Sequence, residues 1–109
     1  MSAGTLGELE HILLLAVMRL GEGAYGVRIR QEILERTGRS VALGAIYPTM
    51  DRLEAKGYVS SRRSEPTPER GGRAKRLFRL EPDGVAALER GHEAFMALWE
   101  GFEPGAVDR

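Results

Sequence analysis

The sequence predicts a mainly α-helical fold with a small β-hairpin, and three observations lead to this class. Apolar residues recur at helical spacing in four segments of the chain. Two short runs with strand character, residues 58–62 and 75–80, flank a loop that contains two prolines and two glycines. The chain has 109 residues, of which 42% are hydrophobic, and this supports one domain with a modest core. A core of that size favours further burial through oligomerisation.

The first predicted helix runs from Thr5 to about Leu20, before a turn that contains Gly21 and Gly23. Thr5 followed by Glu8 has the spacing of a capping box, which marks a helix start. The apolar stripe of this helix extends around most of its circumference, which predicts burial on more than one side. In so small a domain, we expect the second side to contact another subunit.

The second and third helices are predicted over residues 25–36 and 45–56, with a short extended piece at residues 40–42 between them. Gly38 follows the second helix as a stop signal. Pro48 lacks the N–H that a helix interior needs, so we expect it in or just after the first turn of the third helix, where its cost is small. The residues expected to face the core are Ile29, Ile33 and Leu34 in the second helix and Ile46, Met50 and Leu53 in the third.

A hairpin and a long last helix complete the predicted fold. Val59, Phe78 and Leu80 are the expected inward residues of the two strands, and Pro82 suits the first position of the last helix. From there a 3.5-residue spacing, typical of helices that pair side by side, joins Val85, Leu88, His92, Phe95, Trp99 and Phe102. We therefore interpret the last segment as a dimerisation helix.

The order of these elements, three helices followed by a two-stranded hairpin, is that of a winged helix-turn-helix domain. The predicted fold is thus a winged helix-turn-helix plus a C-terminal dimerisation helix. We assign residues 1–80 to the DNA-binding domain, residues 81–103 to the dimerisation helix and residues 104–109 to a tail.

Charged residues are distributed unevenly, although 16 basic and 16 acidic residues give a formal net charge of zero. Residues 58–80 hold seven basic residues against two acidic ones, a balance of +5. Residues 81–109 hold seven acidic residues against two basic ones, a balance of −5. This polarity predicts that one end of the molecule meets a polyanion, which for this order of elements is double-stranded DNA.

Several classes of protein do not fit the sequence. The chain has no Cys, which excludes a disulfide scaffold and thiolate metal sites. The longest strongly apolar run, residues 12–18, is far shorter than the roughly 20 residues of a membrane span, and no signal sequence opens the chain. We expect a soluble, cytoplasmic protein. His11 and His92 lack ligand spacing and no pattern of an active site is present, so we expect no enzyme, no metal and no cofactor.

Three stretches of the sequence resemble the PadR-type transcriptional regulators over about residues 5–90. They are "LLLAVMRLGEGAYGVRIRQEI", "GAIYPTMDRLEAKGYV" and "GGRAKRLFRLEPDGVAAL". The chain departs from the family pattern at Leu77-Phe78, where an aromatic pair is usual, at Glu81, where Thr is usual, and in a long wing loop. The short tail is similar to small members with a single C-terminal helix. The resemblance implies a dimeric DNA-binding repressor, often of its own promoter, and some members release DNA when small aromatic compounds bind.

The third helix is expected to lie in the major groove as the recognition helix. Thr49 would contact a base edge or a phosphate, while Arg52 would reach a phosphate or guanine, unless it points to solvent or pairs near Glu54. Tyr47 either offers its phenol to the DNA backbone or packs on the hairpin, and Ser40 is either a helix cap or a phosphate contact. The candidate contacts of this region are Ser40, Ala45, Tyr47, Pro48, Thr49 and Arg52.

Two further groups of residues are candidates for binding. The wing is the predicted hairpin together with the loop between its strands. On it, Arg70, Arg73 and Lys75 either contact DNA or form a solvated surface. On the last helix, the candidates for a dimer interface or an effector site are His92, Phe95, Met96 and Trp99. Trp99 is either an interface core residue or part of a cleft for a flat aromatic ligand. His92 is a packed or interface residue that could sense pH or bond an effector.

Two functions remain open from the sequence. The leading hypothesis is a dimeric, sequence-specific transcriptional regulator that represses its own or neighbouring genes, with a small aromatic effector as a possible ligand. The alternative is a winged-helix module that binds protein and not DNA. A basic wing that proved dispensable would favour the alternative.

Overall fold

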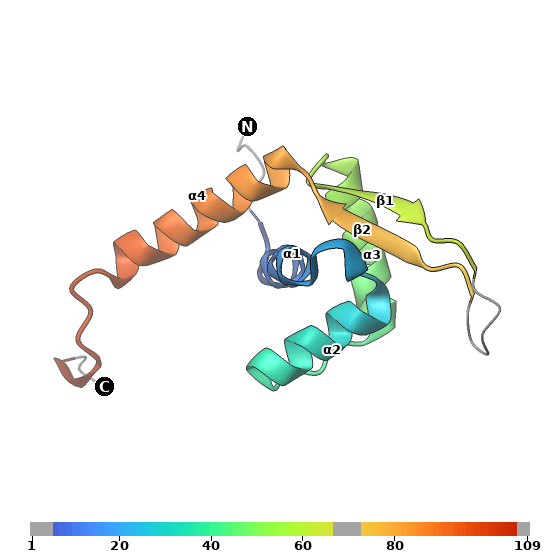
Figure 1. Ribbon diagram of the computed structural model, residues 1–109. Helices are drawn as coiled ribbons and strands as arrows, with labels where there is room; N and C mark the ends of the chain where they lie inside the picture. Colours follow the sequence, from blue (N-terminus) through green and yellow to red (C-terminus); the bar gives the residue numbers. More distant parts are fainter. Residues whose placement is uncertain (1–5, 67–72, 107–109) are drawn as a thin grey trace.

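The structure, a computed structural model, describes residues 6–66 and 73–106 (Figure 1). The elements in chain order are α1 (Glu8–Leu20), a 3-10 turn η1 (Gly21–Gly23), α2 (Gly26–Thr37), α3 (Leu43–Ala55), β1 (Val59–Arg63), β2 (Arg76–Leu80), α4 (Pro82–Trp99) and η2 (Pro104–Ala106). The predicted class, mainly α with a small antiparallel hairpin, is confirmed. No helix of the described ranges is long and apolar enough to cross a membrane.

The core lies where the first three helices meet the hairpin. The largest fully buried side chains are Phe78, Leu13, Leu14, Ile29, Ile46, Met50, Leu53 and Val17. The predicted inward residues of α3 are therefore confirmed, as are Ile29 and Ile33 of α2. Leu34 was predicted to point inward, but 47% of its surface is exposed. It follows Ile33 directly, and one step of about 100° around a helix carries it off the buried stripe.

The start of α1 differs from the predicted capping box. The helix begins at Glu8 and Gly7 is its N-cap residue. The backbone N–H of Gly7 donates to Oε1 of Glu10 at 2.9 Å. Glu10, and not Glu8 as predicted, is therefore the residue whose carboxylate caps the start of the helix. Thr5 lies outside the described residues. Burial raises the pKa of Glu10, but hydrogen bonds from Lys56 (2.8 Å) and Gly7 outweigh it and the net pKa is lowered.

The hairpin packs one face on the core and projects beyond the helices (Figure 1). Its antiparallel register pairs Val59 with Leu80 and Ser61 with Phe78. Val59 and Phe78 are buried as predicted, and Leu80 is half-buried against the core. A further link joins β2 to the chain just before α2, because the N–H of Phe78 donates to the carbonyl of Ala24 at 2.7 Å.

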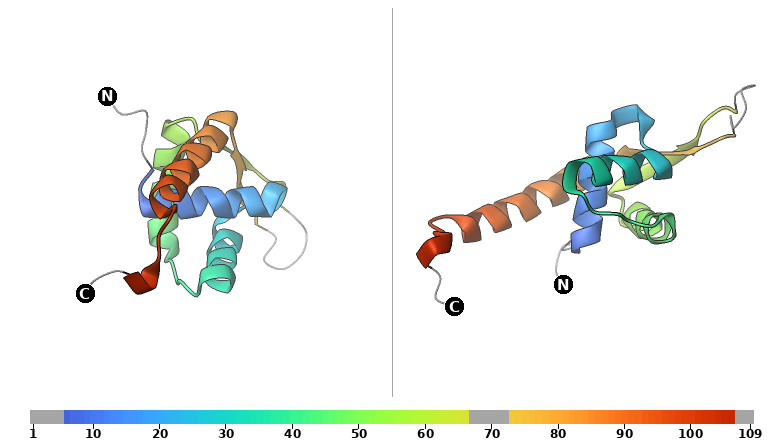
Figure 2. Two further views of the ribbon diagram at one scale, coloured as in Figure 1. Left: turned by 90° about the vertical axis from the view of Figure 1, so that its left-hand side faces the viewer. Right: turned by 90° about the horizontal axis from the view of Figure 1, so that it is seen from below.

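Helix α4 extends away from the rest of the molecule (Figure 2). The radius of gyration is 16.3 Å, whereas a compact domain of this length has about 13 Å. Pro82 is the first helical residue, as predicted. The predicted series of residues at 3.5-residue spacing, from Val85 to Phe102, extends one residue too far. Helix α4 ends at Trp99, and Gly101 adopts a positive φ of 76°. Phe102 therefore lies off the helix and folds back on Trp99, with ring centroids 4.9 Å apart.

Candidate nucleic-acid interface

Helix α3 begins earlier than predicted, and this changes the position of Pro48. The helix starts at Leu43 with Ala42 as N-cap, so Pro48 lies inside the helix and beyond its first turn. Proline there removes the N–H that would bond the carbonyl of Gly44, and inside a helix this costs about 3 kcal/mol. Both Gly44 and Pro48 are exposed, so water can satisfy that carbonyl. The predicted place of Pro48, in or just after the first turn, is therefore wrong, while its outward position is confirmed.

Thr49 was predicted to lie on or beside the open face of α3, and this is wrong. Only 2% of its surface is exposed. Its hydroxyl donates to the carbonyl of Ala45 at 2.8 Å and accepts a hydrogen bond from Nη2 of Arg52 at 3.0 Å. Thr49 thus lies beneath Arg52 and fixes the direction of its exposed guanidinium, because a buried hydroxyl bonds back to the previous turn of the helix.

Tyr47 packs between α3 and the start of α2. The slot that its ring occupies exists because Gly26 has no side chain: a Cβ placed there would lie 2.3 Å from Oη of Tyr47 and 2.5 Å from Cζ. This contact with α2 was not predicted, and packing of Tyr47 on the hairpin stays a prediction. The ring is half-buried, and contact of its phenol with DNA stays a prediction.

Two other residues of this region are exposed. Ala45 lies on the outward face of α3 beside Pro48 and Arg52, as predicted. Ser40 precedes the helix by three residues, and since Ala42 is the N-cap, the predicted capping role of Ser40 is wrong. A phosphate contact of Ser40 stays a prediction.

At the base of the wing, Lys75 is held at both its backbone and its side chain. Its N–H donates to the hydroxyl of Ser64 at 2.8 Å, and its carbonyl accepts from the N–H of Ser64 at 2.8 Å. Its Nζ lies 4.8 Å from the centroid of the Tyr25 ring, a cation–π distance. Arg73 and Lys75 are both exposed, and Arg70 lies outside the described residues.

Arg76, by contrast, forms ion pairs within the fold. Its Nη1 lies 2.8 Å from Oδ1 of Asp51 and its Nη2 lies 2.8 Å from Oε1 of Glu54, so it ties β2 to α3. A hydrogen bond from Ser61 and then one from Arg76 lower the pKa of Glu54. This cation of the basic segment is therefore not free to neutralise phosphates.

Sequence reasoning did not single out Arg62 and Arg63 of β1. Both are exposed, and neither forms an ion pair with any residue of the described part of the chain. A signal existed, since they lie on the strand that was predicted to support the basic loop. With Arg52, Arg73 and Lys75 they give the α3 and wing region its excess of free positive charge.

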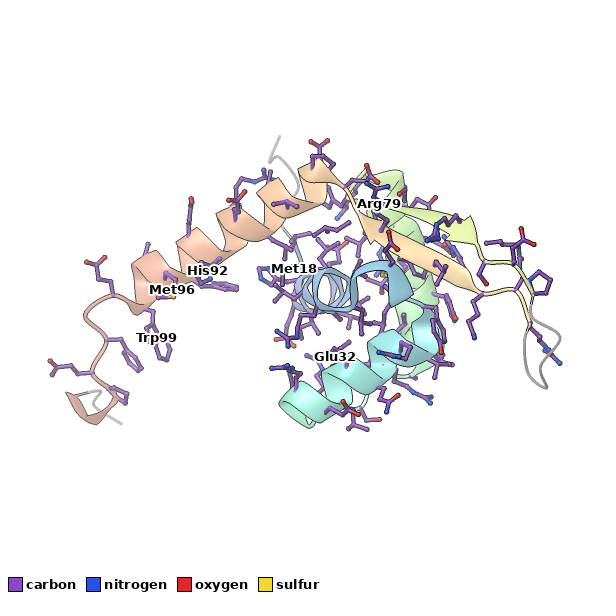
Figure 3. All side chains as sticks on the ribbon, in the orientation of Figure 1. Met18, Glu32, Arg79, His92, Met96 and Trp99 are labelled. Atoms are coloured by element: carbon purple, nitrogen blue, oxygen red, sulfur yellow. The ribbon has the colours of Figure 1, made fainter. Side chains whose placement is uncertain are left out.

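Helix α4 carries apolar side chains that have little cover. The exposed fractions are 65% for Phe95, 85% for Leu98 and 62% for Trp99, and with Phe102 these residues line a hollow of about 290 Å³. Figure 3 shows His92, Met96 and Trp99 following one another along the helix. A flat aromatic molecule suits such a lining, because its faces can stack on indole and phenyl rings.

Helix α4 contacts α1 through a histidine of α1. The ring of His11 lies 5.9 Å from the ring of Phe95 and directly against Gly91, where a Cβ would approach within 2.7 Å of the imidazole. Burial, and then the nearby charge of His92, lower the pKa of His11. His92 itself is exposed, so the predicted packed position is wrong, while its place in an interface stays a prediction.

A larger hollow of about 480 Å³ lies between the end of α1 and the hairpin. Its lining includes the charged residues Glu22, Arg62 and Arg79 along with Met18 and Leu77. This mixed lining suits an apolar aromatic ligand less well than the hollow at Trp99, although the latter is smaller.

Comparisons with known proteins agree with this arrangement. Residues 14–90 match the family model described as "Transcriptional regulator PadR-like family". Over 74 residues the chain is 39% identical to the transcriptional regulator Rv3488 of Mycobacterium tuberculosis, a match that covers 68% of this chain and 64% of that protein. The chain therefore spans less than two thirds of the length of this relative.

Two solved structures are similar over most of the chain. A PadR-like transcription factor from Bacteroides fragilis has a TM-score of 0.69 at 26% identity, with 84% of each chain covered. A winged-helix DNA-binding protein from STIV has a TM-score of 0.66 at 24% identity, covering 85% of this chain and 92% of that one. The predicted winged-helix fold is thereby confirmed.

Proposed function

The chain belongs to the PadR-like family of transcriptional regulators, and from this premise we propose that it is a homodimeric, sequence-specific repressor of its own or neighbouring genes. The observation that carries the proposal is the division of α3 into two faces. Ile46, Met50 and Leu53 are completely buried, while the opposite face is exposed beside a wing with free cations. A recognition helix needs this combination of a fixed inner face and an open outer face.

The chemistry of the outer face of α3 indicates what it reads. Ala45 and Pro48 are small and apolar, which suits contact with the C5-methyl group of thymine. Arg52, oriented by Thr49, has the geometry to bond guanine or a phosphate. Since Thr49 is buried and Asp51 is paired with Arg76, Arg52 is the principal hydrogen-bonding group of this face. Arg73 and Lys75 neutralise phosphates beside the groove.

Dimerisation places two copies of α3 on one DNA duplex. Exposed Phe95, Met96, Leu98 and Trp99 support a partner along α4, because large apolar side chains in a group mark an interaction site. In the dimer, the two recognition helices must lie about 34 Å apart to enter successive major grooves.

An effector is the regulatory part of the proposal. The hollow lined by Phe95, Trp99 and Phe102 supports a small aromatic ligand at the end of α4. Such a ligand would change how two α4 helices meet, and with that the spacing of the recognition helices, so that operator affinity falls. A ligand that binds there and leaves operator affinity unchanged would contradict this part.

Fluorescence anisotropy tests the DNA-binding part directly. The protein is titrated onto labelled DNA from upstream of its own gene and onto scrambled DNA of the same composition, across a salt series. We expect tighter, salt-sensitive binding to the first, weakened by Arg52→Ala and by Arg73→Ala. Arg36→Ala is the matched control, because Arg36 lies in the last turn of α2 and pairs with Glu32.

The outcomes separate the proposed functions. Equal, weak binding to both DNAs at every salt concentration, together with a failure to enrich any site in a selection from genomic DNA, would contradict the repressor and favour the protein-binding module. Light scattering of the same sample measures the oligomeric state, and Phe95→Ser with Trp99→Ser should shift it toward the monomer.

A further inference from the structure

Three consecutive residues before and at the start of α2 each contact a different part of the candidate DNA interface. We propose that Tyr25, the middle one, is a positioning residue that orients the ammonium group of Lys75 and aligns the wing with the recognition helix. The inference rests on the proposed function, since it assigns Tyr25 a part in DNA binding through Lys75.

The contacts on either side of Tyr25 fix its backbone. The carbonyl of Ala24 accepts a hydrogen bond from Phe78 of β2 at 2.7 Å. Gly26 lies against the ring of Tyr47, so closely that no Cβ would fit between them. Tyr25 itself is the N-cap of α2, and its carbonyl accepts from the N–H of Ile29 at 2.9 Å. The segment is thus held between the wing and α3, which fixes the backbone from which the Tyr25 ring projects.

The Tyr25 ring lies where it can hold Lys75. The distance from Nζ of Lys75 to the ring centroid is 4.8 Å, within the range of a cation–π interaction. The backbone of Lys75 is fixed by two hydrogen bonds with Ser64, so only the side chain remains to be ordered. A lysine side chain loses much rotamer entropy when it binds a phosphate, and a ring that orders it beforehand reduces that loss.

The guanidinium of Arg76 also lies over a ring, at 4.8 Å from the centroid of Phe78, but Lys75 differs from it in having no acid partner among the described residues. Arg76 is bound to Asp51 and Glu54, and an acid partner would cancel its charge toward DNA. An aromatic ring orders a cation without neutralising it, so Lys75 keeps its full charge for a phosphate. Tyr25 thereby links one phosphate contact of the wing to the position of α3.

Anisotropy titrations of four variants test the proposal. The variants are Tyr25→Leu, Tyr25→Phe, Lys75→Gln and the double variant Tyr25→Leu/Lys75→Gln. An exposed cation–π contact corresponds to about a two- to fivefold change in affinity, which is the loss expected for Tyr25→Leu. Lys75→Gln should lower the slope of log affinity against log salt by about 0.9. Tyr25→Phe keeps the ring and should bind like the wild type, and Tyr25→Leu should cost nothing further once Lys75 is replaced.

A second measurement does not depend on DNA. The chain has two lysines, Lys56 and Lys75, so its NMR spectrum contains two sets of lysine ε-CH₂ signals. Ring current from Tyr25 should move the Lys75 signals upfield, Tyr25→Leu should abolish that shift, and Tyr25→Phe should retain it. Lys56, which pairs with Glu10 on another side of the molecule, is the internal control.

The results separate failure of this inference from failure of the proposed function. Absence of the upfield shift in the wild type would overturn the contact, and unchanged DNA affinity in folded Tyr25→Leu would overturn its role. Equal losses for Tyr25→Leu with and without Lys75 would show that Tyr25 does not act through Lys75, and this would overturn its role as a positioning residue. A wild-type protein that shows the shift but binds no DNA would instead contradict the proposed function, and with it the role of Tyr25 in DNA binding.

Discussion

The substitution Gly26→Ala tests how α2 and α3 are joined. The new Cβ would lie 2.3 Å from Oη and 2.5 Å from Cζ of Tyr47, whereas ordinary contacts begin near 3.4 Å, so the ring must retreat by about 1 Å. The ring is stiff and belongs to α3, so its movement shifts α3 relative to α2. Overpacking of this kind costs about 1–3 kcal/mol of unfolding free energy. Each kcal/mol lowers Tm by roughly 4–8 °C in a domain of this size.

Urea denaturation at fixed protein concentration measures this loss, and a double-mutant cycle identifies its cause. In a Tyr47→Ala background the clash disappears, so Gly26→Ala should cost nothing there and can gain a few tenths of a kcal/mol from better helix propensity. Gly23→Ala is the matched control, because nothing lies within 4 Å of its added Cβ. Equal costs of Gly26→Ala in both backgrounds would refute the steric argument, as would wild-type stability of the single variant.

Three further predictions concern contacts between elements around this core. Gly84→Ala should lower the free energy of unfolding in urea by more than 3 kcal/mol, because its Cβ would lie 2.3 Å from the backbone oxygen of Tyr58, which cannot move away as a side chain can. A smaller loss than that of Gly26→Ala would contradict this. Arg76→Gln should cost about 1 kcal/mol and raise the pKa of Glu54 in an NMR titration, and an unmoved pKa would argue against the ion pair. The lowered pKa of His11 favours its neutral form in the folded state, so stability should fall as pH drops below 6.5, and His11→Gln should flatten thermal unfolding profiles between pH 6.5 and 5.5.

The sequence predicted the buried face of α3 because that face depends on spacing alone. Ile46, Met50 and Leu53 are +4 and +3 apart, and all three are completely buried. The prediction that Thr49 is exposed was wrong because Thr49 lies at the edge of that stripe, about 60° from Ile46. At such a position the polarity of a side chain favours exposure, but packing can bury it. A usable signal was its distance of four residues from Ala45, at which a Thr hydroxyl can bond the preceding turn.

The wing shows a different limit of sequence reasoning. Arg73, Lys75 and Arg76 are equivalent as charges along the chain, and a local count assigns all of them to DNA. Their roles separate only through contacts with distant residues: Arg76 meets Glu54, 22 positions earlier, and Lys75 meets the ring of Tyr25. Pairing across the fold, which no local spacing encodes, decides which cation remains free.

The apolar side chains of α4 indicate how far this helix alone could support the proposed dimer. Burying the exposed parts of Phe95, Met96, Leu98 and Trp99 in both copies would gain on the order of 10 kcal/mol. Association itself costs an estimated 4–15 kcal/mol, so these residues alone give at best a weak dimer. The wide apolar stripe of α1 leaves Leu15 and Met18 exposed by 37% and 50%, as expected if that helix also meets a second copy. In the proposed dimer, an interface that buries both helices would therefore add the apolar area that α4 alone lacks.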